Sequence, residues 1–131
     1  MNTRIIKTGI LLALLSIITG AFGAHALKQR VAESVMPIFE TAVRYQLYHS
    51  IALIISGILF KEFSNMYIKI AGYLFISGII LFSGSLYFLT FIKGYNINGL
   101  DWTGIITPIG GLLFIAGWFT LFLGTDYSKK F

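Results

Sequence analysis

Four long apolar segments, separated by short polar ones, dominate the chain. They cover residues 8–27, 39–60, 70–92 and 104–124 of 131. A helix needs about 20 apolar residues to cross a hydrocarbon core about 30 Å thick. The pattern therefore predicts an all-α protein, an integral membrane bundle of four transmembrane helices that forms a single domain over residues 1–131.

The second apolar segment is the least regular of the four. Its charge-free run, residues 45–60, would span roughly 24 Å as a helix. The helix is therefore predicted to begin near Phe39, which draws Glu40 and Arg44 toward the membrane. Pro37 suits the first turn of this helix, and residues 31–36 are expected to form a short interfacial helix or a loop.

The composition supports a membrane location. Hydrophobic residues make up 56% of the chain and charged residues only 11%, whereas a soluble domain has about 25% charged residues. The formal net charge of +5 comes from scattered basic residues, so nucleic acid is not an expected partner. The absence of cysteine excludes disulfides and thiolate metal sites.

Lysine and arginine counts favour one orientation, because cytoplasmic flanks carry more of them. One side holds six such residues and the other four. The larger set is Arg4, Lys7, Lys61, Lys69, Lys129 and Lys130, and the smaller set is Lys28, Arg30, Arg44 and Lys93. Both termini are therefore predicted in the cytoplasm. A cleaved signal peptide ending at residues 24–26 is the competing interpretation, but the first apolar run is longer than a usual signal core.

Small residues recur at spacings that let helix backbones approach closely in lipid. We expect them to pack helices within one bundle rather than to form a dimer motif. The candidate packing residues are Gly20, Gly23, Gly84, Gly110, Gly111 and Gly117.

In each of the four spans, polar residues gather in the half that this topology places on the outer side of the membrane, away from the cytoplasm. This candidate cluster comprises His25, Glu40, Arg44, Tyr45, Gln46, Tyr48, His49, Ser83, Ser85, Tyr87 and Thr107. Its members either bond to one another and fix the bundle, or line a site for a polar or amphipathic ligand.

Glu40 and Arg44 are four residues apart, on one helix face. An arginine at the membrane boundary is costly unless its side chain reaches the interface or finds a carboxylate. A structural ion pair between the two is the favoured interpretation. The alternative is an anion or head-group site built around Arg44.

The two histidines, His25 and His49, are weak candidates for a metal or haem site, because such sites normally need three or four ligands and second-shell partners. Histidines hydrogen-bonded between helices are expected instead, and no cofactor or metal is predicted. Catalysis has little support either: Ser83 and Ser85 flank Gly84, but only His49 offers a nearby base. The protein is therefore not expected to be an enzyme.

Four ordered motifs carry a family resemblance. They are Gly20–Leu27 (GAFGAHAL), Thr41–His49 (TAVRYQLYH), Phe82–Tyr87 (FSGSLY), and Thr107–Gly111 (TPIGG) with Gly117-Trp118. In these motifs the chain resembles the small bacterial membrane proteins of the domain of unknown function 423 family, which is similar to a small mitochondrial transmembrane protein of animals. The resemblance implies a compact four-span protein of the bacterial cytoplasmic membrane and supplies no activity.

Two functions follow as expectations. The first is a non-enzymatic accessory or scaffold protein that contacts membrane lipid, another membrane protein or a second copy of itself. The alternative is a binding protein for a small amphipathic ligand, namely a lipid, a quinone or haem, at the outer polar cluster.

Overall fold

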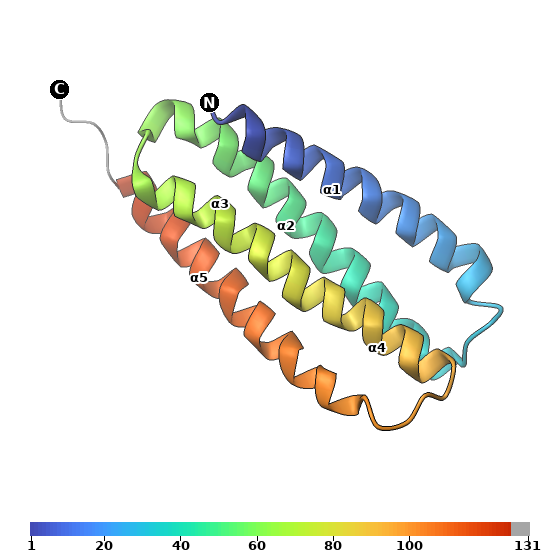
Figure 1. Ribbon diagram of the computed structural model, residues 1–131. Helices are drawn as coiled ribbons and strands as arrows, with labels where there is room; N and C mark the ends of the chain where they lie inside the picture. The colour runs from blue at the N-terminus through green and yellow to red at the C-terminus, as the bar shows by residue number, and fades with distance from the viewer. Residues whose placement is uncertain (127–131) are drawn as a thin grey trace.

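The computed structural model describes residues 1–126 and folds them into four antiparallel helical rods (Figure 1). Within these residues every regular element is a helix. In chain order they are α1 (Thr3–Phe22), the π-helix η1 (Gly23–Leu27), the 3-10 helix η2 (Glu33–Val35), α2 (Met36–Phe63), α3 (Met66–Gly78), the π-helix η3 (Ile79–Ser83), α4 (Gly84–Gly94), the 3-10 helix η4 (Asp101–Ile105) and α5 (Ile106–Asp126).

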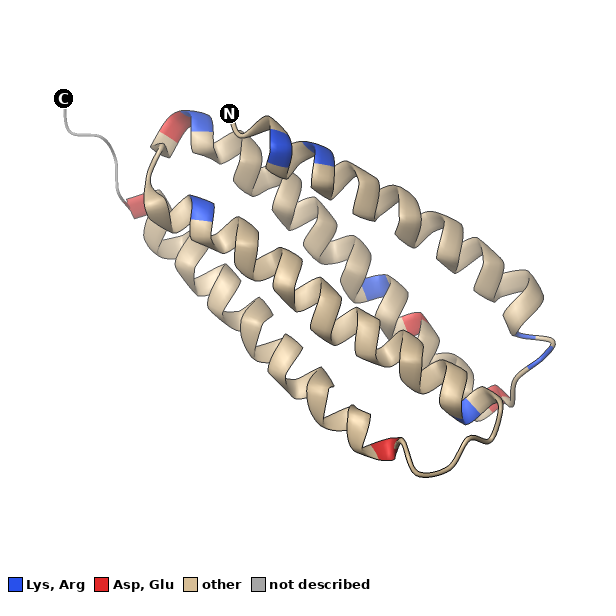
Figure 2. Cartoon of the chain, viewed as in Figure 1, with Lys and Arg blue, Asp and Glu red and all other residues tan. Residues whose placement is uncertain are grey.

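The rods match the predicted spans. Four continuous helical segments, Thr3–Leu27, Glu33–Phe63, Met66–Gly94 and Asp101–Asp126, are long and apolar enough to cross a membrane. Each predicted span lies inside one of them. Charged residues gather toward the two ends of the bundle (Figure 2), and the main exceptions lie in the first half of α2. The predicted all-α bundle of four transmembrane helices is confirmed.

The turns follow from local sequence. Pro37 occupies the first turn of α2, as predicted, and a 3-10 turn precedes it. Ser64 ends α2 in the left-handed conformation (φ 41°), and the Asn65 side chain accepts a bond from Ile68 N at 3.1 Å to cap α3. Asn65 Nδ2 also donates to Gly124 O at 2.8 Å. The α2–α3 turn is therefore fixed to the end of α5.

The helices are not equivalent in position. α2 lies centrally, α1 packs chiefly on α2, and α5 packs chiefly on α3 (Figure 1). The N-terminus and the end of α5 lie at one end of the bundle, here called the proximal end. The connections after η1 and α4 lie at the opposite, distal end. Lys129 and Lys130, used for the orientation, lie outside the described residues.

The apolar core fills the space between α1, α2, α3 and α5. Its buried members are Ile5, Ala52, Leu53, Ile68, Ala71, Phe75, Ile79, Phe114 and Leu121. Three fully buried serines, Ser16, Ser50 and Ser56, donate to carbonyls of their own helix. Their hydroxyl groups are thereby satisfied without help from a neighbour, which lets small side chains face other helices in an apolar medium.

Glycines permit the closest approaches between helices. A Cβ at Gly110 would lie 2.7 Å from Phe82 Cα, and one at Gly117 would lie 2.7 Å from the Phe75 ring. Gly20 faces Val43, and the Phe39 ring occupies the space where a Gly23 Cβ would sit.

Two of the predicted packing glycines, Gly84 and Gly111, make no unusually close approach to another helix. A Cβ at Gly111 would make an ordinary contact with the Phe82 ring at 3.8 Å. Gly84 is exposed, and a Cβ there would meet no atom within 4 Å, so the expected close packing within the bundle is wrong at Gly84. Sequence spacing also missed Gly9 and Gly57, which bring α1 and α2 together.

We expect Gly110→Ala to destabilise the bundle by about 1 to 3 kcal/mol, because the new methyl group meets the Phe82 backbone, which cannot move aside as a side chain can. The control is Gly84→Ala, also in a helix, which should be neutral or stabilising by up to about 1 kcal/mol. Equilibrium unfolding in mixed micelles, followed by helical circular dichroism, measures both. Equal effects of the two substitutions would contradict the packing described for Gly110.

Candidate functional site

The structure divides the predicted polar cluster into a buried group and an exposed group. The members of the first are buried or half-buried, and they are Gln46, His49, Ser83, Ser85, Tyr87 and Thr107. The members of the second are exposed, and they are His25, Glu40, Arg44, Tyr45 and Tyr48. The first group makes contacts between helices, whereas the second lies on the surface of the bundle.

Gln46 bridges three helices. Its Nε2 donates to Leu12 O on α1 at 2.9 Å, and its Oε1 accepts from Tyr87 OH on α4 at 2.6 Å. The amide thus uses a donor and an acceptor at once, and Gln46 is only 6% exposed. Inside a membrane no water can bond to a buried amide, so its hydrogen-bond partners must come from the protein.

Two serines add further contacts between helices, and one of them reaches α5. Ser83 Oγ, at the end of η3, donates to Ala42 O on α2 at 2.8 Å. Ser85 Oγ on α4 lies 2.6 Å from Thr107 Oγ1 on α5. Gln46, Ser83, Ser85, Tyr87 and Thr107 are here called the polar network. It links α1, α2, α4 and α5 in the distal half of the bundle.

His49 forms a separate contact between α2 and α5. Trp118 Nε1 lies 3.1 Å from His49 Nε2, and His49 Nδ1 lies 2.8 Å from Tyr45 O. An indole N–H only donates, so Nε2 accepts, and the neutral ring carries its proton on Nδ1. The imidazole also stacks on Phe114, with ring centroids 3.5 Å apart and an interplanar angle of 9°. Both ring nitrogens are therefore already engaged.

The surroundings of the two histidines bear on the metal hypothesis. Coordination by His49 would require one of its two hydrogen bonds to break. His25 lies exposed on η1. Across residues 1–126, no group of three or more His, Cys, Asp or Glu side chains is arranged to hold a metal ion.

Aromatic side chains beside His49 form an open groove of about 650 Å³. It is lined by Tyr45, His49, Phe82, Pro108, Gly111, Leu112, Phe114, Ile115 and Trp118, and we call it the aromatic groove. Leu112 and Ile115 at its edge are 64% and 66% exposed, so the groove opens on the outer surface of the bundle. Phe114 and Trp118 were not among the predicted site residues, although Trp118 belongs to one of the four sequence motifs.

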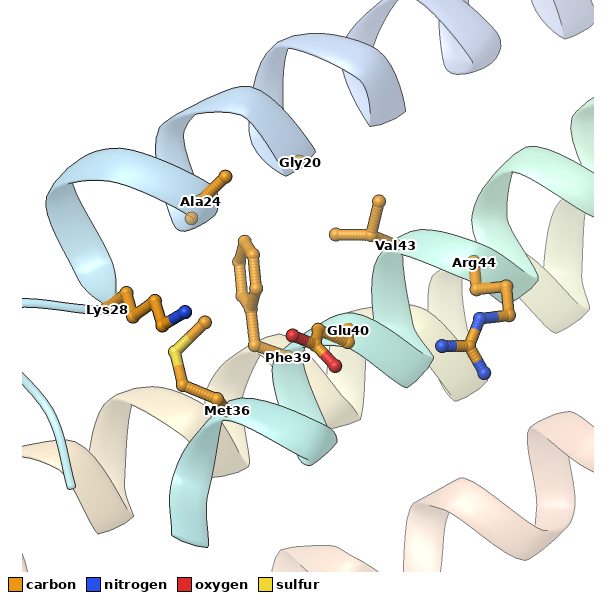
Figure 3. A pocket seen from close by; sticks show the side chains of 9 residues that line it. Gly20, Ala24, Lys28, Met36, Phe39, Glu40, Val43 and Arg44 are labelled. Atoms are coloured by element: carbon orange, nitrogen blue, oxygen red, sulfur yellow. The ribbon is translucent and has the colours of Figure 1, made fainter. Parts of the chain in front are cut away.

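The expected ion pair between Glu40 and Arg44 is wrong. In the described part of the chain, these two side chains do not form an ion pair with each other. Their side chains extend in different directions from α2 (Figure 3).

Comparison with known proteins places the chain among bacterial membrane proteins without an assigned role. A family described as "Protein of unknown function (DUF423)" matches residues 19–111. The UPF0382 membrane protein SH2409 of Staphylococcus haemolyticus is 43% identical over 117 residues, 89% of this chain and 90% of that protein. The UPF0382 membrane protein YwdK of Bacillus subtilis is 37% identical over 111 residues, 84% of this chain and 85% of that protein. No solved structure is significantly similar. The chain therefore belongs to the DUF423 family of membrane proteins of unknown function.

Proposed function

We propose that the protein is a non-enzymatic accessory or scaffold protein of the bacterial cytoplasmic membrane, with both termini in the cytoplasm. One observation carries this proposal: the buried polar side chains in its distal half are hydrogen-bonded to one another or to backbone carbonyls of neighbouring helices. A site that processes a substrate needs polar groups that face that substrate. Here the buried polar groups hold the helices together instead.

The hydrogen-bond inventory supports this assignment. Within residues 1–126, no buried side-chain nitrogen or oxygen is without a partner. Ser83 and Ser85, the two serines considered as nucleophiles, are engaged with Ala42 O and Thr107 Oγ1. The buried polar side chains are therefore explained by the stability of the bundle.

A scaffold of this kind acts through its membrane-facing surface. α1 exposes large apolar side chains such as Leu14 (52%) and Ile18 (56%). α5 does the same with Ile115 and Phe119 (61%). These faces contact lipid or a second protein in the bilayer, and an experiment must distinguish between the two.

Site-specific photo-crosslinking in living cells tests the proposal. A photoreactive residue at Leu14 or Ile115 should give one discrete protein adduct, whereas the fully buried control Leu53 should give none. Mass spectrometry identifies the adduct, which is either a second copy of this chain or another membrane protein. Lipid adducts alone at every exposed position would contradict the scaffold function.

A second candidate function is binding of a small amphipathic ligand, and the aromatic groove favours it. Its volume of about 650 Å³ lies within the range of about 300 to 1,000 Å³ typical of small-molecule sites. Stacked rings of His49 and Phe114 suit a flat ring such as that of a quinone. Haem is less suitable, because both nitrogens of His49 are already hydrogen-bonded.

Tryptophan fluorescence tests this candidate, because the chain has two tryptophans and only Trp118 lines the groove. A short-chain quinone should quench the Trp102→Phe variant saturably, since Trp118 remains. The matched Trp118→Phe variant keeps only Trp102, which is 62% exposed, and should show weak, non-saturable quenching. Identical quenching curves for the two variants would exclude a specific site in the groove.

A further inference from the structure

A groove between the distal ends of α1 and α2 combines apolar walls with a charged rim (Figure 3). Its volume is about 320 Å³, and it is lined by Gly20, Gly23, Ala24, Lys28, Met36, Phe39, Glu40, Val43 and Arg44. A neighbouring hollow of about 530 Å³ shares Lys28, Met36 and Glu40 with it and is also lined by Glu33 and Pro37. We call the two hollows together the α1–α2 groove.

Local backbone geometry shapes this groove. Gly20 and Gly23 present no side chain, so the wall on the α1 side is shallow. At the end of η1, Lys28 N donates to Gly23 O at 3.2 Å, a bond that spans five residues. This π-type turn ends the first rod at Lys28, and Figure 3 shows the Lys28 side chain extending toward Glu40. Such turns occur frequently at functional sites.

The charges on the rim lack protein partners. In the described chain, none of Lys28, Glu40 and Arg44 forms an ion pair. In the view of Figure 3, the Glu40 carboxylate lies between the Lys28 ammonium and the Arg44 guanidinium. The combined rim therefore carries two positive charges, Lys28 and Arg44, and two negative charges, Glu40 and Glu33.

Arg44 lies within the predicted second span. It follows Phe39, where that span is predicted to begin, by five residues, or about 7.5 Å along the helix axis at about 1.5 Å per residue. A cation at this depth is costly without a counter-ion, and such residues commonly mark functional sites. A guanidinium binds phosphate with two parallel hydrogen bonds. The chemistry of the rim thus calls for an anionic partner that is already in the membrane.

We propose that the α1–α2 groove binds an anionic phospholipid whose phosphodiester lies beside hydroxyl donors, as in phosphatidylglycerol. Arg44 and Lys28 bind the phosphate, and Glu40 accepts a hydrogen bond from the neighbouring donor. The first part of an acyl chain lies against Gly20 and Val43. The anionic phosphate thus meets the two cations, and the hydroxyl groups of the head group meet the carboxylates. This site develops the head-group alternative for Arg44 and is separate from both functions proposed above, because it uses neither the polar network nor the aromatic groove.

Native mass spectrometry of the full chain in mild detergent tests the site, with phosphatidylglycerol and phosphatidylcholine as separate titrants. The wild-type protein should prefer phosphatidylglycerol by about tenfold or more, a difference of about 1.4 kcal/mol. The double variant Lys28→Ala/Arg44→Gln should lose that preference. The matched control Arg4→Gln/Lys7→Ala removes the same charge from exposed positions at the proximal end and should bind as wild type does.

Three results would overturn the proposal. The first is equal binding of phosphatidylglycerol by the double variant and the wild type, and the second is no preference over phosphatidylcholine. The third is displacement of the lipid by soluble glycerol phosphate, which would assign the rim to a free phosphate compound.

Circular dichroism checks that each variant is folded. If the double variant is not, Lys28→Ala alone should lower phosphatidylglycerol affinity by about threefold or more, and unchanged affinity would refute the site.

Discussion

The structure depends on one constraint: a polar group inside a membrane must find its partner within the protein. Water is absent from the hydrocarbon core, so each unpaired donor or acceptor costs several kcal/mol. Gln46 meets this constraint with bonds to Leu12 O and Tyr87 OH, and thereby connects α1, α2 and α4. The pair of Ser85 and Thr107 connects α4 to α5 in the same way. The buried polar residues of the network are thus the contacts that align the helices.

Close helix packing is the second consequence of the membrane environment. Apolar side chains gain little by leaving lipid for a protein interior, so helices associate through van der Waals contact and interhelical hydrogen bonds. Gly110 against the Phe82 backbone and Gly9 against α2 supply such contact. This arrangement leaves the α1–α2 groove and the aromatic groove on the outer surface, where lipid-soluble molecules have direct access.

Sequence reasoning predicted the fold well because span length and turn residues are local properties. The four spans, the position of Pro37 and the close approaches at Gly20, Gly23, Gly110 and Gly117 all follow from spacing along the chain. It also placed the polar residues in one half of the bundle. It could not predict which ones bond, because depth in the membrane follows from position along a helix, whereas the rotation of each helix about its axis depends on all its neighbours.

The same limit explains where the structure differs from what the sequence predicts. Gly84 fits a small-residue spacing yet is exposed, directly after the π-helix η3. Glu40 and Arg44 share a helix face yet remain unpaired within the described chain. Trp118 bonds to His49, a contact between residues 69 positions apart that no local pattern indicates. These features decide where candidate sites lie, and only the three-dimensional arrangement shows them.

The central claim is that hydrogen bonds between helices hold the distal half of the bundle together. A double-mutant cycle of Gln46→Met and Tyr87→Phe, measured by unfolding in mixed micelles, tests it most directly. The exposed Tyr48→Phe serves as the control for the loss of a hydroxyl group. We predict a coupling energy of about 0.5 to 1.5 kcal/mol between Gln46 and Tyr87, in the range measured for hydrogen bonds between membrane helices. Strict additivity of the two substitutions would contradict the claim.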